Sequence, residues 1–321
     1  MNFWNKILEE LNQKKKLVLM CVLDSDGSSP GRQGFKMYVT DDHKLEGSIG
    51  GGIMEHKLIE LAKSLLDKGS FQPFIKKQIH RKNIEKEQSG MICSGEQTIG
   101  FYHFDDSDLP FLEKITSNSK SKDHPFLILN HYGFSLIEDQ FTPSKTNFES
   151  LSLKEWTYKE PINHKHLVHI IGGGHVGLAL SQVMNQLDFH VKIYDERNNL
   201  NTMENNSYAH ERHVVNYQNL TDVIPDNSTD YLVLMSFGYR TDETCIKQLL
   251  NRNYRYFGVM GSKSKMETLF TSLLTDGFEQ RQLDKIHTPI GIEINSQTPM
   301  EIAISVAAQI IAVKNGKFLI N

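Results

Sequence analysis

The stretch HLVHIIGGGHVG, residues 166–177, predicts the fold of half the chain. An apolar strand leads into the glycines and a helical pattern follows them, so a G-x-G-x-x-G motif lies between a strand and a helix. Gly172 permits the tight turn, Gly174 lets backbone amides approach a phosphate, and Gly177 allows close packing of the helix. The helix dipole favours an anion at the first turn. The stretch therefore predicts a Rossmann-type turn that binds a phosphate-bearing ligand.

Two residues near this turn refine the prediction. Asp195 ends the next predicted strand, eighteen residues after Gly177, where an acidic side chain accepts a hydrogen bond from a ribose hydroxyl. His175 is an unusual occupant of such a turn, and its ring can narrow the phosphate pocket. The alternative is that the glycines serve packing alone and hold no nucleotide, because a fold does not fix a function.

The alternation of strands and helices continues to the end of the chain. Strands are predicted at 166–171, 190–194, 213–216, 231–236 and 256–260. Because each parallel crossover must cover a face of the sheet, this order predicts a doubly wound parallel α/β sheet over 165–321. The last helix has Thr298 as N-cap and Glu301 completing a capping box, and it is apolar nearly all round. We expect that helix to be buried between domains or in a homodimer.

The first half of the chain predicts a smaller α/β domain, residues 1–141, followed by a polar connector at 142–164. Two glycine-rich loops flank a short strand there, and a helix begins directly on Gly50, Gly51 and Gly52. These loops, with Arg32 and Lys36, form a candidate anion cradle, although turn geometry alone also explains the glycines. Glu55 lies in the first turn of the helix, where its charge favours the dipole.

Three further features carry weaker signals. Ser262 caps a predicted helix beside Lys263, which indicates either an anion site or a capped helix with solvated lysines. Cys93 precedes a Ser-Gly turn, where a thiolate could be exposed, and an inert buried cysteine is the alternative. His164, His166 and His169 alternate along a strand entrance, which predicts a solvated edge.

Composition excludes several classes of protein. The chain has 321 residues, a net charge of -4 and only three cysteines, so nucleic-acid binding, a disulfide framework and a structural metal site are not expected. No apolar run approaches the ~18 residues that cross a bilayer, and the N-terminus lacks the apolar core of a signal peptide. We therefore expect a cytoplasmic protein that does not bind membranes.

Together these motifs closely resemble those of the XdhC/CoxI family, the xanthine dehydrogenase accessory proteins. The resemblance rests on Gly27-Ser28-Ser29-Pro30, residues 47–55, Cys93-Ser94-Gly95-Glu96, the Gly172 motif, residues 258–263, Thr288-Pro289-Ile290-Gly291 and residues 298–303. These motifs cover nearly the whole chain and occur in the order that the family shows. That combination is far more specific than a dinucleotide motif alone.

The resemblance implies a chaperone rather than a stand-alone enzyme. Such a protein binds molybdenum cofactor, protects it while a cysteine desulfurase supplies the sulfido ligand, and passes it to a molybdenum hydroxylase of the xanthine dehydrogenase type. Cys93 would contact the molybdenum or its sulfur. The glycine loops and Lys263 would hold the phosphate of the pterin.

The chain departs from the family pattern at three places. Ile53 stands where the family often has cysteine, and Cys93-Ser94-Gly95 stands where it has Cys-Gly-Gly, so Cys93 is the only candidate thiol. The segment 236–242 replaces a Thr-His-Asp segment of many relatives, and only Asp242 keeps its place.

Two other functions fit the second half of the chain. An NAD(P)-dependent oxidoreductase would need a proton donor facing the nicotinamide, and no Tyr-Lys or His-carboxylate spacing identifies one. A non-catalytic nucleotide sensor would couple occupancy of the turn to the activity of a partner. That function leaves the cysteine-bearing first half without a role.

Overall fold

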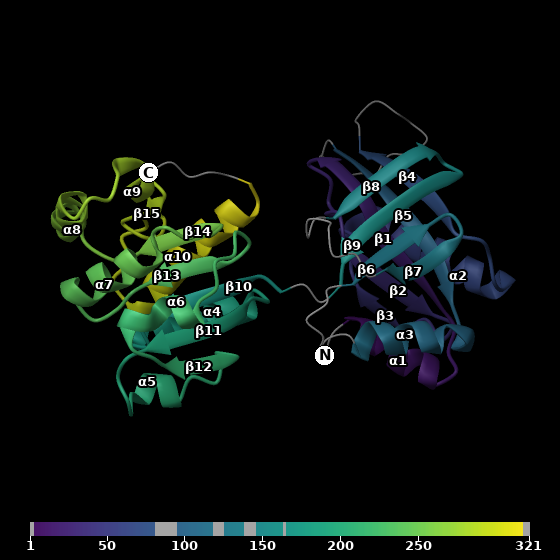
Figure 1. Cartoon of the computed structure of the whole chain (residues 1–321). Coiled ribbons are helices and arrows are strands. Elements are labelled where there is room, and N and C mark those ends of the chain that lie inside the picture. The colour runs from purple at the N-terminus through teal and green to yellow at the C-terminus, as the bar shows by residue number, and fades with distance from the viewer. Residues whose placement is uncertain (1–2, 81–94, 118–124, 138–145, 163–164, 317–321) are drawn as a thin grey trace. The chain divides into compact units, whose positions relative to one another are not determined.

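The computed structural model describes residues 3–80, 95–117, 125–137, 146–162 and 165–316 (Figure 1). The chain forms two compact units, Met1–His164 and Lys165–Asn321. The first unit contains antiparallel sheets and the second a parallel one. The predicted mixed α/β fold, with a Rossmann-type sheet in the second half, is confirmed.

The N-terminal unit contains two antiparallel sheets, of five and four strands. The first has the order β3-β2-β1-β5-β4, with β1 (Leu17–Gly27), β2 (Lys36–Thr40), β3 (Leu45–Gly47), β4 (Phe74–His80) and β5 (Gly95–Phe104). The second has the order β7-β6-β9-β8, with β6 (Phe126–Asn130), β7 (Gly133–Ile137), β8 (Asn147–Ser152) and β9 (Glu155–Pro161). The helices are α1 (Phe3–Asn12), α2 (Gly52–Lys68) and α3 (Leu109–Ser117), with a short 3-10 turn at Asp106–Asp108.

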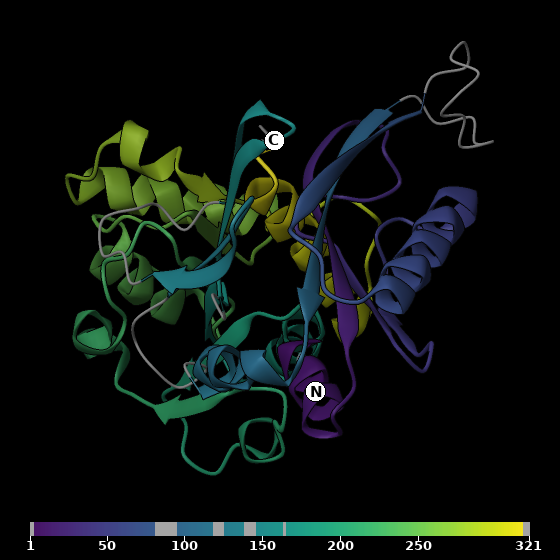
Figure 2. The same cartoon turned by 90° about the vertical axis from the view of Figure 1, so that its right-hand side faces the viewer.

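The first seven residues of strand β1, 17–23, form an uninterrupted apolar run because both faces of this part of the strand are buried. Leu17, Leu19 and Cys21 enter one core, which α1, α3 and the second sheet share. Val18 and Met20 enter a second core beneath α2. Since side chains alternate along a strand, a continuous apolar run is the pattern that a doubly covered strand requires. Figure 2 shows α2 against one face of the five-stranded sheet.

The predicted connector at 142–164 is wrong for most of its described part. Residues in this stretch form β8 and β9, which pair with each other and with β6. Trp156 and Tyr158 alternate with exposed or half-buried neighbours and enter the core. The physical reason for the error is that an alternating strand has a polar average composition, so composition hid its period of two.

The C-terminal unit contains a six-stranded parallel sheet of order β12-β11-β10-β13-β14-β15. Its strands are β10 (Leu167–Ile171), β11 (His190–Asp195), β12 (Glu211–Val214), β13 (Tyr231–Leu234), β14 (Tyr256–Val259) and β15 (Ile286–His287). Its helices are α4 (His175–Gln186), α5 (Asn201–Glu204), α6 (Leu220–Val223), α7 (Tyr239–Leu249), α8 (Lys263–Thr275), α9 (Gln280–Leu283) and α10 (Pro299–Lys314), with a 3-10 turn at Tyr217–Asn219. Helices α4 and α10 share one core with the sheet, and α6, α7 and α8 share the core on the other face.

The strand order changes direction between β10 and β13. From β10 the chain continues to β11 and β12 on one side, then returns to β13, β14 and β15 on the other. The ends of β10 and β13 are joined here, since the amide of Met235, the residue after β13, donates to the carbonyl of Ile171, the last residue of β10, at 2.8 Å. In open α/β sheets, ligands bind at the carboxyl ends of the strands at such a switch point. The topology therefore places the predicted glycine turn at this position.

The capping box predicted for the last helix is confirmed. Thr298 Oγ1 accepts from the Glu301 amide at 3.3 Å, and Glu301 Oε2 accepts from the Thr298 amide at 3.0 Å. The helix packs on α4, yet Met300 is 37% exposed and Ile304 is 50% exposed. The helix is thus not buried on all sides within its unit. Among the described residues, no helix combines the length and hydropathy needed to span a membrane.

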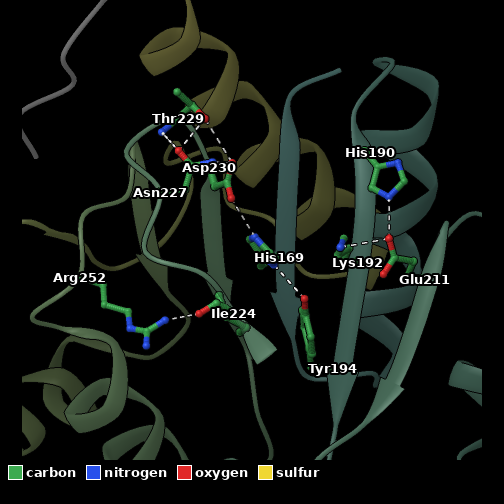
Figure 3. A network of polar contacts seen from close by, with 10 residues as sticks. All are labelled: His169, His190, Lys192, Tyr194, Glu211, Ile224, Asn227, Thr229, Asp230 and Arg252. Atoms are coloured by element: carbon green, nitrogen blue, oxygen red, sulfur yellow. Dashed lines mark hydrogen bonds and ion pairs between the residues drawn. The ribbon is translucent and has the colours of Figure 1, made fainter. Parts of the chain in front are cut away.

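Glu211, on the edge strand β12, joins a charged cluster with His190, Lys192 and His213 (part of it in Figure 3). Burial opposes ionisation, but hydrogen bonds from Lys192 and His190 outweigh it and lower the pKa of Glu211 to about 2. A carboxyl with a lowered folded pKa stabilises the fold above its unfolded pKa, near 4.5, and loses that contribution as pH falls towards 2. We expect the urea midpoint of Glu211→Gln to fall less between pH 4.5 and 2 than that of the unaltered protein. Parallel midpoint curves for the two proteins would contradict this assignment.

Candidate functional site

The glycine turn has the division of roles that its spacing predicts. A Cβ on Gly172 would lie 2.2 Å from the Met235 carbonyl oxygen, and one on Gly177 would lie 2.1 Å from the Gly172 carbonyl oxygen. Gly174 differs, because no atom lies within 4 Å of the position of its Cβ. The first and third glycines are therefore required by packing, while Gly174 borders open space where a ligand can approach.

The two helices that flank the switch point start without a side-chain cap. Gly174 precedes α4 and Gly238 precedes α7, and neither supplies an acceptor for the first-turn amides. By contrast, Ser262 caps α8 and Thr298 caps α10. Uncapped amides at a helix start favour an anion. His175, the first residue of α4, is exposed beside this position.

Asp195 lies beneath the turn but is already hydrogen-bonded through both oxygens. Its Oδ2 accepts from the Gly173 amide at 2.7 Å and from Arg197 Nη2 at 2.8 Å. Its Oδ1 accepts from the amide and Nε of Arg197. Burial opposes ionisation, but these hydrogen bonds outweigh it and lower the pKa of Asp195. A ribose hydroxyl could reach this carboxylate only after the Arg197 pair opens, which the sequence did not indicate.

A buried acid lies behind the loop that follows β13. Asp242 is fully buried and accepts from Ser236 Oγ and Lys265 Nζ. Burial raises the pKa of Asp242, although Lys265 opposes the shift. Of the lysines at the start of α8, Lys265 is thus engaged inside the unit, and Lys263 is exposed. The predicted cap at Ser262 is confirmed, with its Oγ accepting from the Lys265 amide at 3.3 Å.

The glycine loop of the N-terminal unit binds a carboxylate of its own chain. Gly50, Gly51 and Gly52 all have positive φ, and Glu55 folds back onto their turn. Glu55 Oε2 accepts from Ser48 Oγ and the Ile49 amide, both at 2.8 Å, and from the Gly51 amide at 2.9 Å. Burial opposes ionisation, but these hydrogen bonds outweigh it and lower the pKa of Glu55.

The predicted cradle therefore does bind an anion, and that anion is Glu55. A phosphate would have to displace the side chain to reach these amides. The two cations assigned to the cradle are also engaged, since Lys36 pairs with Glu160 at 2.6 Å and Arg32 donates to the Gly27 carbonyl. The sequence predicts an open phosphate site at this loop. The structure corrects that prediction, because Glu55 occupies the site.

The glycine-rich loops of the N-terminal unit pack on each other and on the start of β5. A Cβ on Gly31 would lie 2.2 Å from the Ile49 carbonyl oxygen, and one on Gly95 would lie 2.4 Å from the Ser29 amide nitrogen. Cys93, predicted as the reactive thiol, precedes Gly95 by two residues and lies outside the described residues. The two cysteines that are described, Cys21 and Cys245, are buried, and burial raises the pKa of both thiols. Within the described ranges, no cluster of His, Cys, Asp and Glu is arranged to hold a metal ion.

The doubly wound sheet with its glycine turn at the switch point defines a Rossmann-type protein, preceded here by an antiparallel unit. Two family models match: the XdhC and CoxI family over residues 11–76, and the XdhC Rossmann domain over residues 168–310. The chain belongs to the XdhC/CoxI family.

Several known proteins are similar to this chain over nearly its whole length. The chain is 24% identical over 319 residues to YqeB of Escherichia coli K12, covering 98% of this chain and 47% of YqeB, so it spans about half of that relative. It is 21% identical over 327 residues to a probable xanthine dehydrogenase subunit of Bacillus subtilis strain 168, covering 97% of both. The crystal structure of a xanthine dehydrogenase from Bacillus halodurans superposes with a TM-score of 0.74 at 20% identity, covering 98% of this chain and 96% of that one. At that identity the likeness shows a shared fold.

Proposed function

We propose that this chain is an accessory protein of a xanthine dehydrogenase-type molybdenum hydroxylase. In this role it binds molybdenum cofactor, holds it while a cysteine desulfurase supplies the sulfido ligand, and delivers it to the client. Family membership and the B. subtilis relative support the accessory role. The observation that carries the binding step is the open face at Gly174, where the uncapped start of α4 meets free space.

The residues at this turn fit the phosphate of a pterin cofactor. The Gly174 backbone and the first-turn amides of α4 would hold that phosphate, and His175 would border it. When bound, the cofactor supplies the molybdenum chemistry that the client enzyme needs. The chain contributes binding and shielding, and Cys93 is proposed as the thiol that contacts the metal or its sulfur.

A nucleotide sensor is the second candidate. The absence of a side-chain cap on both α4 and α7 supports it, because a dinucleotide phosphate at the switch point would meet both helix starts. A homodimer through the exposed apolar residues of α10, Met300 and Ile304, is compatible with either function.

The test compares cofactor retention in Gly174→Val and Cys93→Ala with retention in Thr275→Val, an exposed control on α8. Gly174 has φ -68 and no neighbours at its Cβ, so valine should leave thermal stability nearly unchanged while it blocks the approach of a phosphate. We expect Gly174→Val to retain about tenfold less molybdenum cofactor after gel filtration, the loss of roughly one charge-assisted contact. We expect Cys93→Ala to weaken retention as well and Thr275→Val to leave it unchanged. Undiminished retention in both site variants would reject the proposed carrier.

A further inference from the structure

Arg197 and Phe237 face each other across the switch point, and neither belongs to the glycine motif. Arg197 follows β11 and Phe237 follows β13, so they come from the loops on either side of the turn after β10. The Arg197 guanidinium carbon lies 5.7 Å from the centroid of the Phe237 ring. At the carboxyl edge of a doubly wound sheet, these two loops flank the ligand crevice.

The guanidinium of Arg197 is bound on one edge only. Nε and Nη2 each donate to an oxygen of Asp195 at 2.8 Å, which fixes the plane of the group. An arginine has five N–H donors in a rigid fork, so the edge at Nη1 points away from Asp195. Among the described residues that edge forms no hydrogen bond, and the side chain is 40% exposed. The fork therefore offers charged donors towards solvent.

The ion pair between Arg197 and Asp195 determines which ligand group can bind here. Asp195 Oδ2 accepts from both the Gly173 amide and Arg197, so the cation is held next to the glycine turn. Both oxygens of Asp195 accept hydrogen bonds, and its charge is paired with Arg197. A Rossmann site that binds a ribose diol has a free carboxylate at this position, whereas this site presents the guanidinium of Arg197. A phosphate matches such donors better than a neutral pair of hydroxyls does.

Phe237 supplies an apolar surface for a flat ring. Its side chain is 82% exposed, although aromatic side chains are usually among the more buried ones. If the contact between Arg197 and Phe237 served packing alone, we would expect the Phe237 ring to be covered. An exposed ring beside a guanidinium is a surface on which heteroaromatic bases stack.

We propose that Arg197 and Phe237 form the selective end of a nucleotide site, with the base stacked on Phe237 and a phosphate on the adjacent ribose bound by Arg197. The site thereby prefers a nucleotide phosphorylated on that ribose over one with a free diol. This inference rests on the proposed phosphate site at the glycine turn, and it does not depend on the molybdenum cofactor.

NADP⁺ and NAD⁺ are the matched probes, because they differ by one phosphate on the adenosine ribose. Calorimetry on the full chain should show NADP⁺ binding at least about tenfold more tightly than NAD⁺. Arg197→Met should abolish or invert this ratio, since it uncovers Asp195, which repels the phosphate and can accept from a diol. Phe237→Leu should weaken both dinucleotides by about fivefold or more and leave their ratio unchanged. Arg281→Met, which alters a largely exposed arginine of α9, should bind as the unaltered protein does.

Equal affinity for the two probes, or a ratio that survives in Arg197→Met, overturns the selection by Arg197. Unchanged affinities in Phe237→Leu overturn the stacking surface. Binding of neither probe overturns the whole inference. Molybdenum cofactor retention, measured in parallel on the unaltered protein, decides the proposed function separately, because retention without dinucleotide binding would leave the accessory role standing.

Discussion

Gly172→Ala should destabilise the C-terminal unit by about 3 kcal/mol or more. Gly172 has φ +117, a conformation that L residues avoid, and its Cβ would lie 2.2 Å from the Met235 carbonyl oxygen. That oxygen belongs to backbone at the end of β13, and the Met235 amide is tied to β10 by a hydrogen bond to Ile171, so neither side can shift cheaply. Urea unfolding followed by circular dichroism should show the loss in the transition of this unit.

Gly174→Ala is the matched control two residues away. Gly174 has φ -68, and no atom lies within 4 Å of its Cβ position. Alanine there should change the free energy of unfolding by less than about 1 kcal/mol, because the weaker N-cap preference of alanine and the restriction of the unfolded chain oppose each other. Similar losses in both variants would show that the turn is not held between β10 and β13 as described.

The elements governed by local rules were predictable from the sequence. The strand, turn and helix around Gly172 follow from residue spacing and backbone sterics, and the cap of the last helix follows from Thr298 and Glu301. Both concern neighbours within a few positions in the chain. The structure accordingly confirms the Rossmann-type sheet and the capping box.

The partners of the site residues were not predictable in the same way. The sequence identified two glycine turns, at residues 50–52 and 172–174, as sites that favour an anion. It did not indicate that Glu55 accepts from the Gly51 amide in the first turn, or that Asp195 accepts from the Gly173 amide in the second. Such contacts depend on how far a side chain folds back in three dimensions. Arg197 and Phe237 were missed because they belong to separate loops and meet only through the strand order.

His169 shows the same limit inside the sheet. Its alternation with His164 and His166 predicted a solvated edge, yet His169 is fully buried. Its Nδ1 lies 2.9 Å from the Tyr194 hydroxyl and its Nε2 lies 3.2 Å from Asp230 Oδ2 (Figure 3). Because β10 is a central strand, covered on both faces, that prediction is wrong for this residue.

His169→Ala should therefore cost about 3–5 kcal/mol of unfolding free energy, since it leaves a cavity and removes the partner of two buried polar groups. His169→Phe keeps most of the volume and removes only the hydrogen bonds, so we expect a loss of about 1–3 kcal/mol. Urea unfolding of both variants, with Asp230→Asn to probe one partner, separates the packing contribution from the polar one. Removal of a fully buried ring with two hydrogen-bond partners should cost more than about 1 kcal/mol. A smaller loss in His169→Ala would therefore mean that this network does not hold β10 to its neighbours.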